Sequence, residues 1–143
     1  MNILVAVDFS DVSRGIVDLV RRLPQADRGK VFLLHVTEPD PEFVGWEAGP
    51  GVVRDQMAAH FQHQRREIES MAADLREAGR DVTAMVIQGP TVATILDEIE
   101  RRGAGLVVVG SHGHGAAYDL LVGSISSGVI RKSPVPVLVV PHR

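Results

Sequence analysis

Five short apolar runs divide the chain, and they alternate with longer segments in which apolar residues recur at helical spacing. Each run has the length of a β-strand and is apolar almost throughout, rather than at every second position, which is typical of strands buried on both faces of a sheet. The runs are residues 3–7, 31–36, 82–87, 106–109 and 135–140.

Four of the intervening segments are expected to be amphipathic helices. Capping and turn residues bound them, so we expect helices between Ser10 and Pro24, over residues 54–78, between Val92 and Gly103, and over residues 124–131. In the longest of these, steps of four and three residues predict one buried stripe made of Met57, Phe61, Gln64, Ile68, Met71, Leu75 and Ala78.

The alternation of strand and helix predicts an α/β fold: a single-domain, open, five-stranded parallel sheet with helices on both faces, Rossmann-like, with strand order 3-2-1-4-5. Ligands of such folds bind at the carboxyl ends of the strands, where the chain order reverses across the sheet. We therefore expect the site among residues 8–11, 37–53, 88–91 and 110–123. The segment 37–53 is rich in proline and glycine and is expected to be a mobile loop that closes over the ligand.

The composition excludes several classes of protein. With 143 residues, 45% of them hydrophobic, the chain is expected to form one domain over residues 1–143. The formal charge of −3 without a cluster of Lys and Arg argues against nucleic-acid binding, and the lack of cysteine excludes disulfides and thiolate chemistry. No apolar run approaches the length of a membrane span, so we expect a cytoplasmic protein without membrane insertion.

Glycines follow the fourth apolar run at positions 110, 113 and 123, and Ser124 comes directly after the last of them. The simplest interpretation is a tight turn followed by a capped helix. Because these positions lie together at the predicted ligand edge, we favour a phosphate site, in which glycines let the backbone curl around the oxygens and the helix N-terminus offers free N–H groups. The pattern is neither a P-loop nor a dinucleotide fingerprint, since no G-x-x-x-x-G-K-[ST] is present and Tyr118 stands where the fingerprint needs glycine.

These glycines and both chain ends resemble the nucleotide-binding branch of the universal stress protein family. Gly110, Gly113, Gly123 and Ser124 reproduce the pattern G-x2-G-x9-G-[ST], while ILVAVDFS, LLHV and SPVPVLVV are similar to the first, second and last strands of that family. The resemblance implies a regulatory or stress protein that binds ATP or another adenine nucleotide, with magnesium carried by the nucleotide. It also implies a homodimer formed through the last strand, from Val135 to Val140.

The resemblance assigns roles to individual residues. Asp8 and the main chain of Ala6 and Val7 would meet the nucleoside, and Val36 would pack near adenine. The ribose and phosphates would be held by Gly110, His112, Gly113, Gly123, Ser124, Ile125 and Ser126. The chain departs from the family in two places, since Ala6-Val7 replaces a frequent Pro-Thr and His112 stands where Arg is common.

Other chemistry is less strongly indicated. His112 and His114 are two residues apart in a loop with no nearby carboxylate except Asp119, which favours a phosphate or solvent contact over a metal site. His35 lies inside an apolar run and is expected to be a core histidine. No serine has a base placed by spacing, so no catalytic group is assigned.

We therefore expect an ATP-binding regulatory protein that acts as a ligand-dependent switch on an unidentified protein partner. A slow ATP hydrolase or nucleotidyl-transfer enzyme on the same fold is the alternative. A ligand-free interaction module, in which the glycine loop is purely structural, is the third possibility.

Overall fold

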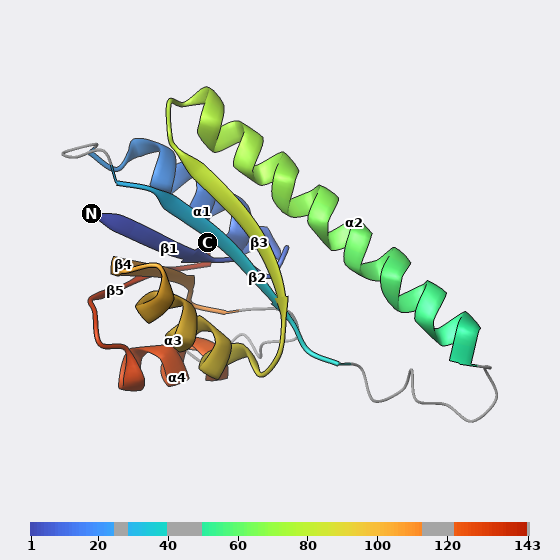
Figure 1. Cartoon of the computed structure of the whole chain (residues 1–143). Coiled ribbons are helices and arrows are strands. Elements are labelled where there is room, and N and C mark those ends of the chain that lie inside the picture. Colours follow the sequence, from blue (N-terminus) through green and yellow to red (C-terminus); the bar gives the residue numbers. More distant parts are fainter. Residues whose placement is uncertain (25–28, 40–49, 113–121, 143) are drawn as a thin grey trace.

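The structure is a computed structural model that describes residues 1–24, 29–39, 50–112 and 122–142. The strands are β1 (Asn2–Ala6), β2 (Val31–Thr37), β3 (Val82–Gln88), β4 (Ala104–Gly110) and β5 (Val137–Val140). The helices are α1 (Asp11–Arg22), α2 (Pro50–Glu77), α3 (Thr91–Arg101) and α4 (Ser124–Lys132). Strand and helix alternate along the chain as the hydrophobic pattern predicts (Figure 1).

The five strands form one parallel sheet in the order β3-β2-β1-β4-β5. Leu4 in the central strand lies beside Phe32 of β2 and Val107 of β4, and Val108 lies beside Leu138 of β5. The predicted fold class and strand order are therefore confirmed. The chain order reverses between β1 and β4, so this pair marks the point at which a ligand of such a sheet is expected.

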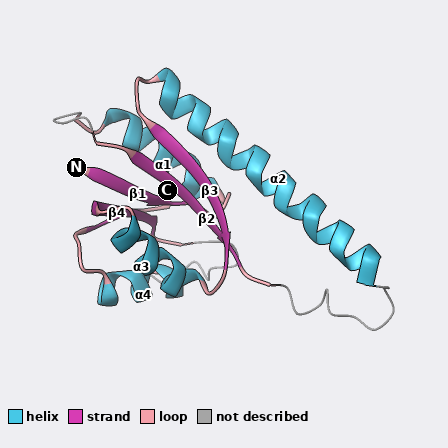
Figure 2. Ribbon diagram, in the orientation of Figure 1, coloured by secondary structure: helices cyan, strands magenta, loops and turns pink. Residues whose placement is uncertain are grey.

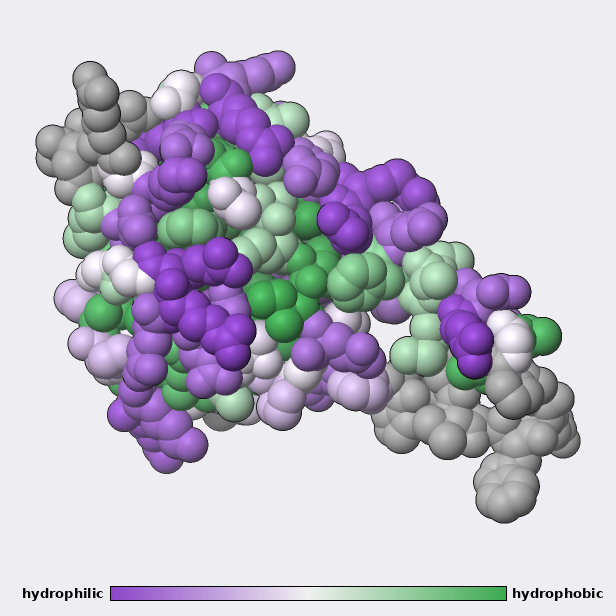
Figure 3. Space-filling model, in the orientation of Figure 1, coloured by the Kyte–Doolittle hydropathy of each residue, from purple (hydrophilic) through white to green (hydrophobic). Residues whose placement is uncertain are grey.

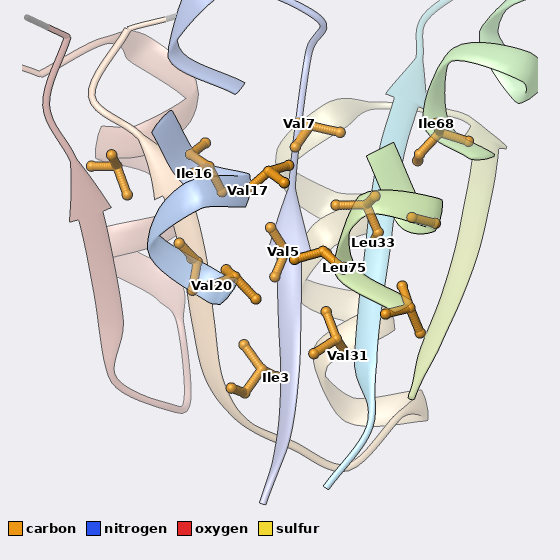
Figure 4. Packing of buried hydrophobic residues seen from close by; sticks show 14 of the residues in the cluster. Ile3, Val5, Val7, Ile16, Val17, Val20, Val31, Leu33, Ile68 and Leu75 are labelled. Atoms are coloured by element: carbon orange, nitrogen blue, oxygen red, sulfur yellow. The ribbon is translucent and has the colours of Figure 1, made fainter. Parts of the chain in front are cut away.

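Helices α1 and α2 cover one face of the sheet. Ile3 and Val5 of β1 point to this face, where they pack with Ile16 of α1 and with Ile68 and Leu75 of α2 (Figure 4). All five side chains are at most 8% exposed. Burial of this apolar surface is the main favourable contribution to folding on this side of the sheet.

Helices α3 and α4 cover the opposite face (Figure 2). Leu4 of β1 points this way and packs with Ile95 and Ile99 of α3 and Val129 of α4. Neighbouring residues of β1 therefore serve different cores. This explains why the strand is apolar throughout rather than at every second position.

Glycine ends two of the helices as predicted. Gly79 follows α2 with a φ of +85°, and Gly103 follows α3 with a φ of +56°. Both angles lie in the left-handed region, where a residue with a Cβ is strained and glycine is not. These two positions turn the chain into β3 and β4.

Several predicted boundaries differ from the structure, and those of α2 and β5 have a clear physical reason. Helix α2 begins at Pro50, so residues 50–53 of the predicted mobile loop are helical. Proline fits the first turn of a helix because the N–H it lacks would have no partner there. Strand β5 begins at Val137 rather than at Val135, since Pro136 has no N–H to donate and joins the sheet only through its carbonyl oxygen, which accepts a bond from Val107 N–H. Residues 40–49 of the predicted loop lie outside the described residues.

The apolar stripe predicted along α2 is buried only in the C-terminal half of the helix. Gln64, Ile68 and Leu75 are buried, whereas Met57 is 42% exposed and Phe61 is half-buried. The helix has 28 residues and its N-terminal half extends past the sheet (Figure 1). Among the described residues no helix is both long and apolar enough to cross a membrane.

A pair of alanine substitutions tests this division of α2. Ile68→Ala is expected to lower the free energy of unfolding by about 2 to 5 kcal/mol, because it leaves a cavity under the sheet. Met57→Ala is expected to change it by less than about 0.5 kcal/mol, because Met57 has little packing to lose. Urea unfolding of both variants measures the difference, and equal losses would mean that the N-terminal half of α2 is also packed.

Candidate functional site

The candidate site lies at the carboxyl edge of the sheet, where β1 and β4 end and α1 and α4 begin. β1 ends at Ala6 and β4 at Gly110, and the two strands are hydrogen-bonded neighbours. The crossover from each strand leads to a different face of the sheet, since α1 belongs to one core and α4 to the other. This divergence is the structural feature that places ligands at the switch point of an α/β sheet.

Ser111 connects the three segments that meet at this edge. Its N–H donates to the carbonyl oxygen of Val140 at the end of β5 (2.8 Å), and its carbonyl oxygen accepts from the N–H of Gly123 at the start of α4 (2.6 Å). Ser126, one turn into α4, donates its hydroxyl to the carbonyl oxygens of Gly110 and Ser111. The N-terminus of α4 is thereby held against the end of β4.

Glycine at two positions makes this close approach possible. A Cβ added at Gly110 would lie 2.8 Å from Cγ1 of Val12 in α1, and one at Gly123 would lie 3.2 Å from the carbonyl oxygen of Ser111. Neither residue has a positive φ. Gly110 is therefore needed for packing against α1 whether or not a ligand binds, so the structural interpretation of this glycine has its own support.

Three helix N-termini at this end of the sheet differ in charge. At α1, the Asp8 carboxylate accepts from the N–H and hydroxyl of Ser10, and Asp11 stands in the first turn. At α3, the Glu38 carboxylate accepts from the N–H (3.3 Å) and hydroxyl (2.8 Å) of Thr91. Each of these two ends already has a negative group near its positive dipole.

Helix α4 has neither a side-chain cap nor an acidic residue in its first turn. Its first intrahelical bond in the described structure runs from Ser127 N–H to Gly123 O (2.9 Å). The N–H groups of Ser124, Ile125 and Ser126 precede that bond and have no carbonyl within the helix to which they could donate. Of the three helix N-termini compared, this is the one that keeps its positive end uncompensated by a carboxylate of the described residues.

The predicted site residues are distributed around this end of α4. Ala6 and Val36 are half-buried on the α3 and α4 side of the sheet, whereas the side chain of Val7 is buried on the other side. Ser124 and Ile125 are exposed at the start of α4, and the Ser126 hydroxyl is buried in the bonds described above. Gly113 lies outside the described residues.

Asp8 and His35 have partners within the protein. Oδ1 of Asp8 accepts from Ser10 and from the hydroxyl of Ser13 (3.3 Å). Nδ1 of His35 lies 2.9 Å from the carbonyl oxygen of Val7, and Nε2 lies 3.1 Å from Nε2 of Gln64. Burial lowers the pKa of His35 below its ordinary value, because it disfavours the charged form. His35 is therefore a hydrogen-bonded core histidine, as expected.

Phe9, the residue after Asp8, has a φ of +63°, which is unusual for a residue with a side chain. Its ring packs against the ring of His35 with centroids 4.3 Å apart. This contact fixes the chain where it leaves β1, and the turn brings the Asp8 carboxylate to the start of α1. The sequence gives no local signal for this conformation.

A groove of about 490 Å³ lies between α1 and α2, away from the start of α4. Four carboxylates and one guanidinium line it, together with Phe9, Ser10, Val17, Ser70 and Met71. The groove is on the face opposite α4, and its acidic lining does not suit an anionic ligand. Among the described residues no group of three or more His, Cys, Asp and Glu side chains could hold a metal ion.

Sequence reasoning missed two residues of this edge. From the sequence, no serine, Ser111 included, is expected to have a base near it, and Glu38 falls within the expected loop at 37–53. Glu38 meets Thr91 across 53 positions of the chain, so the spacing of residues carries no signal for that bond. Ser111 could have been identified from its position, since it directly follows the last residue of β4 and directly precedes His112.

Comparison with known proteins gives a consistent result. A family model described as "Universal stress protein family" matches residues 1–141. Universal stress protein MJ0577 of Methanocaldococcus jannaschii is 29% identical over 153 residues, covering 99% of this chain and 94% of the relative. The solved structure of MJ0577 superposes with a TM-score of 0.85 at 24% identity, covering 99% and 96% of the two chains.

Two further solved structures share the fold and contain nucleotides. A universal stress protein in complex with cAMP has a TM-score of 0.66 at 22% identity, with 99% of this chain and 96% of the other covered. A universal stress protein from Archaeoglobus fulgidus in complex with dAMP has a TM-score of 0.61 at 19% identity, with 98% and 97% covered.

The attachment of α4 to β4 can be tested by removing one hydroxyl. Ser126→Ala is expected to lower the free energy of unfolding of the ligand-free protein by about 1 to 3 kcal/mol, because it deprives the Gly110 carbonyl of a buried donor. Ser127→Ala, one residue further along the same helix, is the control and is expected to cost less than about 0.5 kcal/mol. Thermal unfolding monitored by circular dichroism compares the two, and equal stability would contradict the structural role of the Ser126 hydroxyl.

Proposed function

Because this chain belongs to the universal stress protein family, we propose that it binds an adenine nucleotide, ATP first among the candidates, and acts as a ligand-dependent regulatory switch. The observation that carries the proposal is the N-terminus of α4 beside Gly110, which, unlike those of α1 and α3, has no carboxylate of the described residues bonded near it. Three backbone N–H groups and the positive end of the helix dipole coincide at this position, which makes it suitable for binding an anion. In this fold, the phosphates of a nucleotide are the anion that best fits a helix N-terminus.

The neighbouring residues support a nucleoside on the same side of the sheet. Ala6 and Val36 are half-buried and apolar, and both pack on the core that also contains Val129 of α4. A base lying over these strand ends would leave its phosphates directed to the start of α4. The cAMP and dAMP complexes of two proteins with this fold support the adenine class.

The hydrogen bonds of the nearest carboxylate, that of Asp8, favour a regulatory role over an enzymatic one. Asp8 would be the obvious base for activating water, but its Oδ1 accepts bonds from Ser10 and Ser13 at the start of α1. An oxygen that is engaged in these hydrogen bonds is poorly placed to take a proton from a water molecule beside a ligand. Magnesium would reach this site on the nucleotide phosphates.

We also propose a homodimer through β5, consistent with the family resemblance. β5 is one edge of the sheet, and its free N–H and C=O groups can pair with a second copy around a two-fold axis. The other edge, β3, also presents apolar side chains to the surface (Figure 3). The two edges therefore need to be tested separately.

The phosphate site is tested by two nearly isosteric substitutions at the start of α4. Gly123→Asp and Gly123→Asn add the same Cβ beside Ser111, and both side chains are good helix caps. The carboxylate repels phosphate and the amide does not, so ATP is expected to bind at least about tenfold more weakly to the Asp variant than to the Asn variant. Calorimetric titration with magnesium and ATP measures the affinities.

The melting temperatures of the ligand-free variants are the control for this comparison. They are expected to be similar, because Asp and Asn cap a helix about equally well. Equal ATP affinities in two equally stable variants would show that phosphate does not lie at the start of α4.

The dimer is tested by a charge at each edge of the sheet. Leu138→Lys in β5 is expected to shift the protein toward monomer, because burying an ammonium group at the pairing edge is expected to cost more free energy than dimer formation gains. Thr83→Lys in β3 is the control and is expected to leave the dimer intact. Sedimentation equilibrium distinguishes them, and a dimer that Thr83→Lys dissociates but Leu138→Lys does not would place the interface on β3.

A further inference from the structure

Strand β3 is an edge of the sheet, and only the side that faces β2 is paired. At the two ends of this pairing, the N–H of Val31 donates to the carbonyl oxygen of Asp81 (2.8 Å), and the N–H of Gly89 donates to that of Thr37 (3.0 Å). In a parallel ladder every second residue bonds to the neighbouring strand, so the odd-numbered residues of β3 face β2. The N–H and C=O groups of its even-numbered residues therefore point away from the sheet.

One of these outward groups has a partner within the chain. The guanidinium of Arg76 on α2 donates to the carbonyl oxygen of Val82 through Nε (3.3 Å) and Nη2 (3.0 Å), which agrees with the outward direction of the even-numbered residues. The outward backbone groups of Ala84, Val86 and Gln88 have no hydrogen bond to any other part of the chain that the structure describes. β3 also contains no charged residue and no proline, the residue types that commonly protect an edge strand from pairing.

The side chains of β3 leave apolar surface along the same edge. Ala84 and Val86 point to the face of the sheet that α1 and α2 cover, whereas Met85 and Ile87 point to the face that α3 and α4 cover. All four side chains are only half-buried, and apolar surface is visible along this edge (Figure 3). A further strand beside β3 would cover this surface and would also satisfy the outward N–H and C=O groups.

The charges of α2 beside this edge are self-complementary. Arg76 marks the flank of α2 that borders the edge, Glu69 pairs with Arg76 on this flank (2.9 Å), and Arg65 lies one helical turn before Glu69. α2 runs back along β3 (Figure 1), and the strand from Val82 to Val86 is about 13 Å long, which equals about nine residues of helix. Counted back from Arg76, the level of Val86 falls about midway between Arg65 and Glu69. A two-fold axis at Val86 would therefore bring Arg65 of one copy opposite Glu69 of a second copy.

We propose that β3 and this flank of α2 form a surface for a second copy of the chain, in which the two β3 strands pair antiparallel about a two-fold axis at Val86. Val86 pairs with Val86 of the other copy, and Ala84 pairs with Gln88, so the three outward residues all gain partners. Between these hydrogen-bonded pairs, Met85 lies opposite Ile87 of the other copy and the apolar strip is covered.

This contact is separate from the nucleotide site and from the pairing proposed for β5. Because the Arg76 side chain occupies the edge at Val82, the pairing is short, and we expect it to be weaker than the pairing through β5. It would then join copies only as the protein concentration rises. Thr83→Lys is expected to remove this contact and to leave the β5 dimer intact.

Cysteine cross-linking tests the register directly, because the chain has no cysteine of its own. A mixture of the Met85→Cys and Ile87→Cys proteins, oxidised at high protein concentration, is expected to form a covalent dimer, since residues opposite each other in an antiparallel pair come within reach of a disulfide. Either variant alone is expected to give less covalent dimer, because its cysteines then lie diagonally across the pair. Ile87→Cys mixed with Ala73→Cys, whose cysteine is exposed on α2, measures random oxidation.

A proline in the strand shows whether the cross-link depends on the edge. Ala84→Pro removes an outward N–H and leaves the bonds from β3 to β2 in place, so the protein is expected to stay folded. Added to both cysteine variants, it is expected to lower the yield of covalent dimer at least about fivefold, because each copy loses a hydrogen bond to the other.

A yield from the Met85→Cys and Ile87→Cys mixture that is no higher than the yield from the Ala73→Cys control would overturn the proposal. So would a yield that Ala84→Pro leaves unchanged in a protein whose melting temperature shows that it is folded. If Ala84→Pro prevents folding, the comparison with Ala73→Cys still decides. Failure of the protein to bind ATP would overturn the proposed function and would leave this contact unaffected.

Discussion

The attachment of the N-terminus of α4 to the end of β4 is the constraint on which the candidate site depends. Ser111 provides most of it, since its N–H, carbonyl oxygen and hydroxyl bond to Val140, Gly123 and His142 respectively. Glycine at 110 and 123 lets these backbones approach, and Ser126 completes the attachment from within the helix. If α4 began further from the sheet, its N–H groups would face solvent rather than the switch point between β1 and β4.

An anion site in this protein cannot rely on net charge, because the chain carries a formal charge of −3. The contrast among helix N-termini resolves this difficulty. Carboxylates of Asp8 and Glu38 accompany the starts of α1 and α3, whereas α4 has no acidic residue in its first turn and has Arg131 and Lys132 at its far end. In the proposed site the attraction for phosphate would therefore come from backbone dipoles, within a molecule that is acidic overall.

The sequence predicted the fold well because the governing signals are local. Runs such as 31–36 are too apolar for a surface strand, and Gly79 and Gly103 end their helices by a property of glycine alone. The exposure of Met57 could not be foreseen, since helical spacing reveals the apolar face of α2 but not where the sheet beneath it ends. For the candidate site, the glycine pattern indicated the edge where β4 ends, and that assignment stays a prediction. The bonds from Thr91 to Glu38 and from His142 to Ser111 join residues far apart in the chain, so the sequence carries no local signal for them.

The most direct test of the account is a map of backbone amide shifts during titration with magnesium and ATP. The amides of Ser124, Ile125 and Ser126 are predicted to shift most, together with those at the ends of β1 and β2. The groove between α1 and α2 lies on the other face of the sheet and is predicted to remain unchanged. Shifts confined to that groove, or no shifts at millimolar nucleotide, would contradict the assignment of an adenine-nucleotide site to the start of α4.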